Sequence, residues 1–258
     1  MNLAAPQLHL GDREPPPFEV INPGSSSPFF LVCDHASNHV PADLHCLGLL
    51  PEQLELHIAY DIGSAAMTRR MAKVLGAPAV LAGFSRLVID ANRVIHHETS
   101  IPEISDGVSV PGNLGLDAEE RKRRVERYFD PYHQAVAAGL EAALARGERP
   151  ILVSMHSFTA IMNGFQRPWQ VGVLWDKDDR IAAPLIRALA ARGINVGDNQ
   201  PYSGGTEFGF TMRHHAFRLG LPQVLLEVRQ DLVGEPSQAE AWADLLMEEL
   251  ERLAFLDA

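Results

Sequence analysis

The stretch Phe29 to His35, FFLVCDH, decides the fold of this sequence. Five apolar residues in a row are typical of a buried strand, and the polar pair that follows marks the point where the strand ends. The stretches ILVSMH (151–156) and PQVLLEVRQ (222–230) show the same pattern of an apolar run that carries polar residues near its end. Shorter apolar runs predict three further strands, PAVLAGF (78–84), RLVID (86–90) and VGVLW (171–175).

Helical stretches lie between the predicted strands. The segment from Asp61 to Leu75 is predicted to be a helix, with Asp61 near its start and Gly76 after its end. A charged helix is expected from Asp117 to about Ala145, since Asp117 and Glu120 form a capping-box pair. Two more helices are predicted, over about residues 180–192 and 238–255. Strands that alternate with helices indicate one α/β domain with a mostly parallel sheet.

Three segments are predicted to be irregular. Residues 1–17 are polar and rich in proline, and we expect a loose arm before a single domain that spans residues 18–258. Residues 91–117 are rich in glycine, proline and serine, and a loop this long is usually functional or mobile. The stretch DNQPYSGGTEFGF (198–210) is predicted to be a second, Gly-rich loop. We find no internal repeat and no linker that would divide the chain.

The composition of the 258 residues excludes several classes of protein. Hydrophobic residues make up 46% and charged residues 21%, as in ordinary globular domains. A net charge of −11 disfavours general binding of nucleic acid, which needs a basic face. The sequence has no run of 18 consecutive apolar residues, so no membrane span is expected. Cys33 and Cys46 are too few for a disulfide framework, and the first residues do not resemble a signal peptide, so we expect a cytoplasmic protein.

Polar side chains gather where the predicted strands end. In open α/β sheets, ligands bind at the carboxyl ends of the strands. The side chains are Asp34 and His35 after the first strand, Asp90, Asn92 and Arg93 after another, His156 after ILVSM, and Glu227 and Arg229 on the last strand. Histidines, carboxylates and arginines at one sheet edge would suit a metal-dependent hydrolase. Serine hydrolases are disfavoured because no Gly-x-Ser-x-Gly motif occurs.

Seven short motifs give the sequence a resemblance to a known family. They are DHASNHVP, HIAYDIGSAAM, SRLVIDANR, DPYH, MHSF, DNQPYSG and LLEVRQDL, in this order over about residues 30–232. In these motifs the sequence resembles the N-formylglutamate amidohydrolase family, which is distantly similar to zinc carboxypeptidases and aspartoacylases. The resemblance implies a three-layer α/β/α sandwich with a mixed, mostly parallel sheet of the zinc-carboxypeptidase-like (phosphorylase/hydrolase-like) type.

The resemblance also implies a catalytic Zn²⁺ or another divalent metal. His35 and His156 match ligand positions of the related families. One position departs from the pattern, because Asn38 stands three residues after His35 where those families carry a glutamate. Asp61 is the candidate for the third ligand, since it lies at a predicted helix start shortly after His35. The alternative is that Asp61 only caps that helix.

Glu227 is the candidate for the general base. It matches the late catalytic glutamate of the related families, and it lies in an otherwise apolar strand, where an unpaired charge is costly. The alternative is a structural ion pair of Glu227 with Arg229 or Arg213. Arg229 is a second catalytic candidate, as a clamp on the substrate or as a group that stabilises the developing oxyanion.

Asn92 and Arg93 match the carboxylate-binding pair of the carboxypeptidase-like families, and an arginine can hold a carboxylate with two parallel hydrogen bonds. The alternative for Arg86 and Arg93 is an ion pair with Asp90. If Arg86 is not held in that ion pair, it would bind the side-chain carboxylate of the substrate. The remaining candidates for substrate contact are Tyr202, in the motif DNQPYSG, and His214, just after the Gly-rich loop.

The reaction that the resemblance implies is hydrolysis of N-formyl-L-glutamate to formate and glutamate, a step in histidine degradation. The partner is then a small N-acyl amino acid, and no oligomeric state is predicted. Two alternatives stay open at this point. One is a related hydrolase of another N-acyl amino acid or small peptide, and the other is a non-catalytic protein that binds an amino acid, since Asn38 replaces the expected glutamate.

Overall fold

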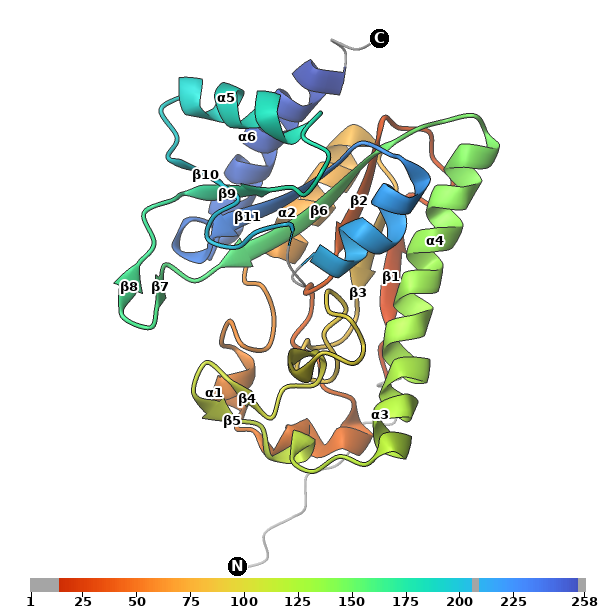
Figure 1. Cartoon of the computed structure of the whole chain (residues 1–258), viewed down its shortest axis with the longest axis vertical. Helices are drawn as coiled ribbons and strands as arrows, with labels where there is room; N and C mark the ends of the chain where they lie inside the picture. The colour runs from red at the N-terminus through yellow and green to blue at the C-terminus, as the bar shows by residue number, and fades with distance from the viewer. Residues whose placement is uncertain (1–13, 206–208, 255–258) are drawn as a thin grey trace, which may run out of the picture.

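A seven-stranded sheet lies at the centre of the computed structural model, which describes residues 14–205 and 209–254 (Figure 1). The strand order is β1-β3-β2-β6-β11-β9-β10. The strands are β1 (Phe18–Ile21), β2 (Phe29–Cys33), β3 (Ala79–Ala82), β6 (Ile151–Phe158), β9 (Val171–Leu174), β10 (Val196–Asp198) and β11 (Gln223–Arg229). Neighbouring strands are parallel except in the pairs β1–β3 and β9–β11. The predicted mixed, mostly parallel sheet is therefore confirmed.

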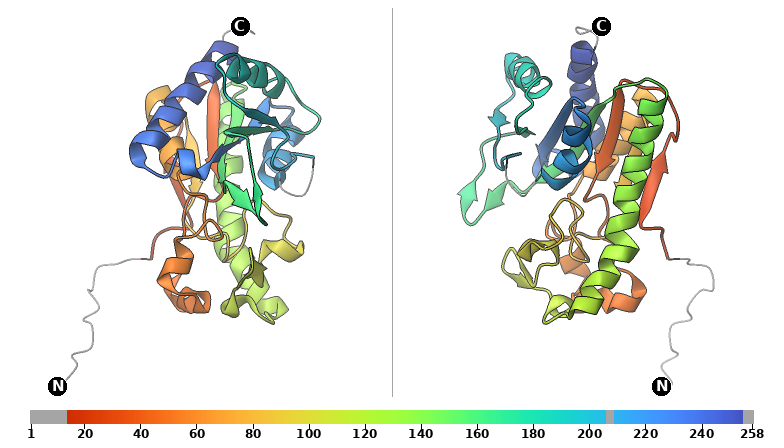
Figure 2. Two further views of the ribbon diagram at one scale, coloured as in Figure 1. Left: turned by 90° about the vertical axis from the view of Figure 1, so that its left-hand side faces the viewer. Right: turned by 45° about the vertical axis from the view of Figure 1, so that its right-hand side comes forward.

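Helices cover both faces of this sheet (Figure 2). One face packs against α2 (Ser64–Leu75), α5 (Ala182–Ala191) and α6 (Pro236–Ala254). The other face packs against α4 (Asp130–Ala145) and the π-helix η6 (Met212–Phe217). The predicted three-layer α/β/α sandwich is thus confirmed. Within the described residues, no helix combines the length and the apolar character that crossing a bilayer requires.

The alternation of side chains along the strands decides which face carries the polar residues. Leu152 of β6 and Leu225 of β11 belong to the core on the α4 side. Side chains two residues apart point to the same face of a sheet, so His156 and Glu227 point toward the α4 side as well. The register of the two strands places Glu227 opposite His156.

Shorter elements surround the ends of the strands. They are the 3₁₀-helices η1 (Ala42–Gly48), η2 (Glu98–Ser100), η3 (Pro111–Asn113) and η7 (Gln230–Leu232), the helices α1 (Pro51–Leu54) and α3 (Ala118–Arg124), the π-helix η4 (Val125–Phe129), and the hairpins β4 (Ile104–Ser105) with β5 (Val108–Ser109) and β7 (Ile161–Met162) with β8 (Phe165–Gln166). The predicted cap of the charged helix is present, because the side chain of Asp117 accepts the Glu120 N–H at 2.8 Å.

One predicted strand is wrong. Of residues 86–90, RLVID, the first three form a turn and the last two have no regular structure, so none of them pairs with a strand. Their backbone hydrogen bonds run to loops instead, from Arg86 N–H to the carbonyl of Ala59 and from Asp90 N–H to that of Ser100. The apolar run is buried, as expected, but it packs into the core on the α4 side. Strands β1 and β10 were not predicted, because four and three residues give little periodic signal.

Besides residue 255 at the end of the predicted closing helix, parts of two predicted segments lie outside the described residues. These parts are residues 1–13 of the N-terminal arm and residues 206–208 of the Gly-rich loop. Within the described part of the arm, residues 14–16 have no regular structure, and the carbonyl of Pro17 accepts the Gly83 N–H at 2.9 Å.

Gly172 in β9 is a position where the fold tolerates no side chain. It lies opposite Glu227 in the sheet, and a Cβ atom there would come within 2.2 Å of the carbonyl oxygen of Gln200. Gly172→Ala should therefore lower the free energy of unfolding by roughly 1–3 kcal/mol, measured by urea denaturation. Gly234→Ala is the matched control, since the nearest atom to its added Cβ would be 3.5 Å away. Equal stabilities of the two variants would contradict this prediction.

Candidate active site

A cavity of about 340 Å³ opens at the carboxyl ends of β2, β6 and β11. Its walls come from the strand ends, from the segment before α2, from the irregular residues 86–106 and from Tyr202. The predicted site residues that line it are His35, Asp61, Arg86, Asn92, Arg93, His156, Tyr202 and Glu227. The fold therefore brings together all the predicted site residues except Arg229 and His214.

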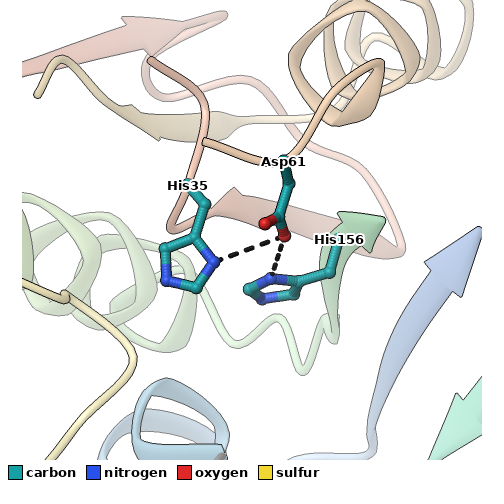
Figure 3. A group of neighbouring side chains, drawn as sticks. All are labelled: His35, Asp61 and His156. Atoms are coloured by element: carbon teal, nitrogen blue, oxygen red, sulfur yellow. Dashed lines mark hydrogen bonds and ion pairs between the residues drawn. The ribbon is translucent and has the colours of Figure 1, made fainter. Parts of the chain in front are cut away.

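Two histidines and one carboxylate meet on one side of this cavity (Figure 3). Nδ1 of His35 lies 3.3 Å from Oδ2 of Asp61, and Nδ1 of His156 lies 2.8 Å from the same oxygen. All three side chains are buried, and their candidate ligand atoms lie within 4.8 Å of one another. The chain brings them there from the end of β2, the loop before α2 and the end of β6.

A further carboxylate holds each of the two histidine rings from behind. Nε2 of His35 lies 2.7 Å from Oδ1 of Asp90, and Nε2 of His156 lies 3.0 Å from Oδ2 of Asp34. A carboxylate only accepts hydrogen bonds, so each Nε2 carries a proton. This arrangement turns both Nδ1 atoms toward Asp61, as in metal sites where a carboxylate orients the ligating histidine.

The electrostatics of the three residues favour a cation between them. Burial alone would lower the pKa of His156, but its hydrogen bonds to Asp34 and Asp61 outweigh burial and raise this pKa to about 10. Burial would likewise raise the pKa of Asp61, yet His35 and His156 hold it well below its usual range. A divalent metal would take the place of the proton on Nδ1 of His156.

The donor set fits a catalytic zinc site. Two imidazole nitrogens and one carboxylate oxygen are a usual set of three protein ligands, which leaves one position open for water or substrate. The carboxylate of Asp61 contacts the two histidines. It does not cap α2, because the cap residue of that helix is Gly63 and no side chain caps it. Asn38 points away, and its amide donates to the carbonyl of Leu54 and to Glu55, each at 3.1 Å.

Arg86 lines the cavity, but its guanidinium is occupied by carboxylates. It bonds Oδ2 of Asp90 through two nitrogens, at 2.7 and 3.1 Å, and Oδ1 of Asp61 at 3.3 Å. Burial would raise the pKa of Asp90, but Arg86 and the other cations nearby hold it well below the usual range. Arg86 therefore forms the ion pair with Asp90 that was the alternative to a contact with the substrate.

Asn92 and Arg93 lie on the same wall of the cavity. Asn92 is anchored at its side-chain oxygen, which accepts the Thr211 N–H at 3.1 Å. Arg93 donates to the carbonyl of Asn92 at 3.0 Å and to the hydroxyl of Thr99 at 3.3 Å. Its guanidinium lies 4.0 Å from Asp90, a looser contact than that of Arg86. Arg93 thus adds a positive charge to the cavity in a fixed orientation.

Glu227 lines the same cavity beside His156, with a carboxyl group that is not fully bonded. Among the described residues, its Oε2 is buried and has no hydrogen-bond partner. Burial raises the pKa of Glu227 to about 7, helped by Asp61 and opposed by His156. A carboxyl group with such a pKa can both accept and release a proton near neutral pH.

Arg229 and His214 lie outside the cavity lining. The chain turns into η7 directly after Arg229, so its guanidinium bonds Asp231 at 2.7 Å and the carbonyls of residues 167–169 at 3.2 to 3.3 Å. Within the part of the chain that the structure describes, Arg229 forms an ion pair with Asp231 and none with Glu227. His214 stacks on Phe210, with the ring centres 5.0 Å apart. The geometry gives neither residue a contact with a substrate in this cavity.

The model of one protein family, N-formylglutamate amidohydrolase, matches residues 27–233. The chain belongs to the N-formylglutamate amidohydrolase family. The structure of gene product Atu2144 from Agrobacterium tumefaciens is 32% identical, with a TM-score of 0.90 over 93% of this chain and 95% of that one. The N-formylglutamate amidohydrolase from Ralstonia eutropha JMP134 shares the fold at 21% identity, with a TM-score of 0.61 over 92% and 95%. No curated protein matches the sequence.

Several residues that build this site had been given no role from the sequence, although Asp34 had been noted at a strand end. Asp34 is the centre of this group, since it accepts hydrogen bonds from the hydroxyls of Tyr132 at 2.8 Å and Thr211 at 2.7 Å. Asp34 and Tyr132 stand in the motifs DHASNHVP and DPYH, which offered a signal. Thr211 stands in no motif, and only the fold shows that it reaches the site.

A pair of neutral histidines lies directly behind Asn92. Nε2 of His133 donates to the carbonyl of Ala91 at 2.9 Å, so its Nδ1 accepts from Nε2 of His215, also at 2.9 Å. Burial lowers the pKa of His133 to about 4 and that of His215 to about 3. Both rings therefore stay uncharged at neutral pH.

This pair should make the folded state sensitive to acid. The unfolded chain binds protons on these histidines near pH 6.5, whereas the folded chain binds them only near pH 3 to 4. The stability that the neutral pair contributes is thus present above pH 6.5 and is lost as the pH falls below that value. In His133→Gln, the free energy of unfolding should fall less steeply between pH 6.5 and 4.5, by up to about 1.4 kcal/mol per pH unit.

Urea denaturation at several pH values measures this slope. His39→Gln is the control, because His39 lies near the surface with its side chain 33% exposed. An unchanged slope in His133→Gln would contradict the neutral state of the pair.

Proposed function

We propose that the protein hydrolyses the amide bond of a small N-acyl amino acid, with N-formyl-L-glutamate as the first candidate, and that it uses a divalent metal, zinc first. The family identifies the chain as an amidohydrolase. The observation that carries the proposal is the cavity that an incompletely bonded Glu227 lines together with His35, His156 and Asp61.

His35, His156 and Asp61 would hold the metal, which would polarise the amide carbonyl and lower the pKa of a bound water when present. The remaining residues of the site supply binding and proton transfer. The positive charge of Arg86 compensates the charges of Asp61 and Asp90, so the carboxylates that shape the site stay ionised without repelling one another.

Glu227 would move the proton. Its carboxylate accepts a proton from the attacking water as the water oxygen bonds to the carbonyl carbon. The same carboxyl group then gives this proton to the nitrogen as the carbon–nitrogen bond breaks. The products are a carboxylic acid and a free amino acid, formate and glutamate in the case of N-formyl-L-glutamate. A pKa near 7 suits a group that must perform both transfers.

Arg93 and Asn92 would bind the α-carboxylate of the substrate. Arg93 is almost fully buried, and a planar guanidinium in a fixed position recognises a carboxylate with two parallel bonds. Tyr202 lines the same cavity and accepts a hydrogen bond from Arg167 at 3.2 Å. A cavity of about 340 Å³ is at the small end of the range for ligand sites, which agrees with a small substrate.

The proposed site also speaks against a non-catalytic protein. That alternative rested on Asn38 at the position of a ligating glutamate, and Asp61 takes over the role of this carboxylate in the site proposed here. Only two cysteines and an acidic net charge support a cytoplasmic enzyme that acts on a small molecule.

Release of the free amino acid from a panel of N-formyl and N-acetyl amino acids tests the function. We expect the zinc-loaded protein to turn over N-formyl-L-glutamate, and a chelator to abolish this activity until zinc is restored. His35→Ala should bind little zinc and should stay inactive after zinc is added. Preference for another N-acyl amino acid would change the substrate only, whereas no turnover on the whole panel would contradict the proposal.

Glu227→Gln keeps the shape of the side chain and removes the proton acceptor. Turnover should fall by roughly 10²–10⁴-fold, the usual contribution of general-base catalysis. Zinc content should stay the same, because Glu227 is not proposed as a ligand. Steady-state kinetics, elemental analysis and melting temperature on one sample separate these effects.

Glu249→Gln is a matched control for this variant. Glu249 is equally buried, but it lies on α6 and pairs with Arg192 far from the cavity. This control should lose stability and keep its turnover per folded molecule. Loss of zinc in Glu227→Gln would make Glu227 a ligand, and unchanged turnover would leave it only a structural part.

A further inference from the structure

Hydrogen bonds and ion pairs around the two metal-binding histidines form a closed ring. From His35 the ring passes to Asp90 (2.7 Å), to the N–H of Asn92 (2.8 Å), from the Asn92 side chain to Thr211 (3.1 Å), to Asp34 (2.7 Å), to His156 (3.0 Å), to Asp61 (2.8 Å) and back to His35 (3.3 Å). Every member of the ring is buried.

Thr211 is the member that joins two functionally different parts of this ring. Its backbone N–H bonds the side-chain oxygen of Asn92, which belongs to the substrate wall. Its hydroxyl bonds Oδ1 of Asp34, which holds the ring of His156. Thr211 comes from the chain segment that leads into η6, whereas the other members come from the ends of strands and from the loops beside them.

The hydroxyl of Thr211 matters because Asp34 is fully buried and charged. A buried carboxylate needs hydrogen-bond donors to stay ionised, and the two donors to Oδ1 are the hydroxyls of Thr211 and Tyr132. With both in place, Oδ2 is directed at Nε2 of His156. With one donor removed, the carboxylate would turn toward the remaining donors, and the ring of His156 would lose its fixed orientation.

We propose that Thr211 is a positioning residue that fixes His156 for metal binding through Asp34 and at the same time fixes Asn92 for substrate binding. The part that concerns the metal rests on the function proposed above. Thr211 touches neither the metal ligands nor the substrate in this proposal, and it acts through the two side chains that it bonds.

Thr211→Val tests the role of the hydroxyl, since valine has the same shape and keeps the backbone N–H. Second-layer partners of metal ligands typically change metal affinity by 10–100-fold, so we expect the zinc affinity of this variant to fall by about that factor. Thr211→Ser restores the hydroxyl and should bind zinc nearly as tightly as the natural protein. Competition with a zinc chelator measures both affinities, and circular dichroism confirms that the variants are folded.

A loss of stability alone would have a different signature. If Thr211 only filled space, Thr211→Val would bind zinc as tightly as the natural protein, and Thr211→Ser would be the less stable of the two; this result would overturn the proposal. If Thr211→Val does not fold, Thr211→Cys, which donates only weakly, carries the same expectation.

A second measurement needs no metal. In the metal-free protein, the proton on Nε2 of His156 should give a downfield NMR signal, which is assigned by its absence in His156→Gln. Thr211→Val should shift this signal and Thr211→Ser should not, and equal signals in all three proteins would overturn the proposal. If the natural protein binds no zinc, the metal part of the proposed function fails, and this signal still decides the role of Thr211.

Discussion

The structure of this site depends on the burial of three carboxylates at one edge of the sheet. Asp34, Asp61 and Asp90 are each almost inaccessible to water, and buried charges of one sign are costly unless cations and donors surround them. Arg86 supplies a cation, and the two histidine rings and the hydroxyls of Tyr132 and Thr211 supply hydrogen-bond donors. The polar residues of the site are therefore the ones that this burial requires.

The sheet explains why these groups face the same space. In β6 and β11, every second side chain points to the α4 side, where Leu152 and Leu225 join the core, and this alternation places His156 and Glu227 on that side as well. The polar residues follow directly where the apolar ones stop. The close approach of Gln200 to Gly172 limits the space beside Glu227, so the strands next to the site also decide which side chains fit there.

Much of this arrangement follows from the sequence, and the rest follows from contacts that only the fold makes. The apolar runs predicted β2, β3, β6, β9 and β11, and the polar residues after the predicted strands gave six of the residues that line the cavity, whereas Asp61 and Tyr202 came from a predicted helix start and a loop motif. The run RLVID was wrongly predicted to be a strand, because a buried segment with apolar residues need not pair with a strand. Arg229 was predicted to be a site residue but does not line the cavity, since sequence position cannot show that the chain turns away directly after that residue. Thr211 gave no signal, because its partner Asp34 stands 177 residues earlier in the chain.

The same separation has a consequence for the synthesis of the protein on the ribosome. Chains emerge from their N-terminus, and contacts between distant residues form only when both partners are available. Asp34 and His35 leave the ribosome early, but the hydroxyl of Thr211 and the central strand β11 follow only in the last fifth of the chain. The carboxylates at this edge of the sheet can therefore be buried with all their partners only after Thr211 and β11 have been made, so the site is among the last parts of the fold to close.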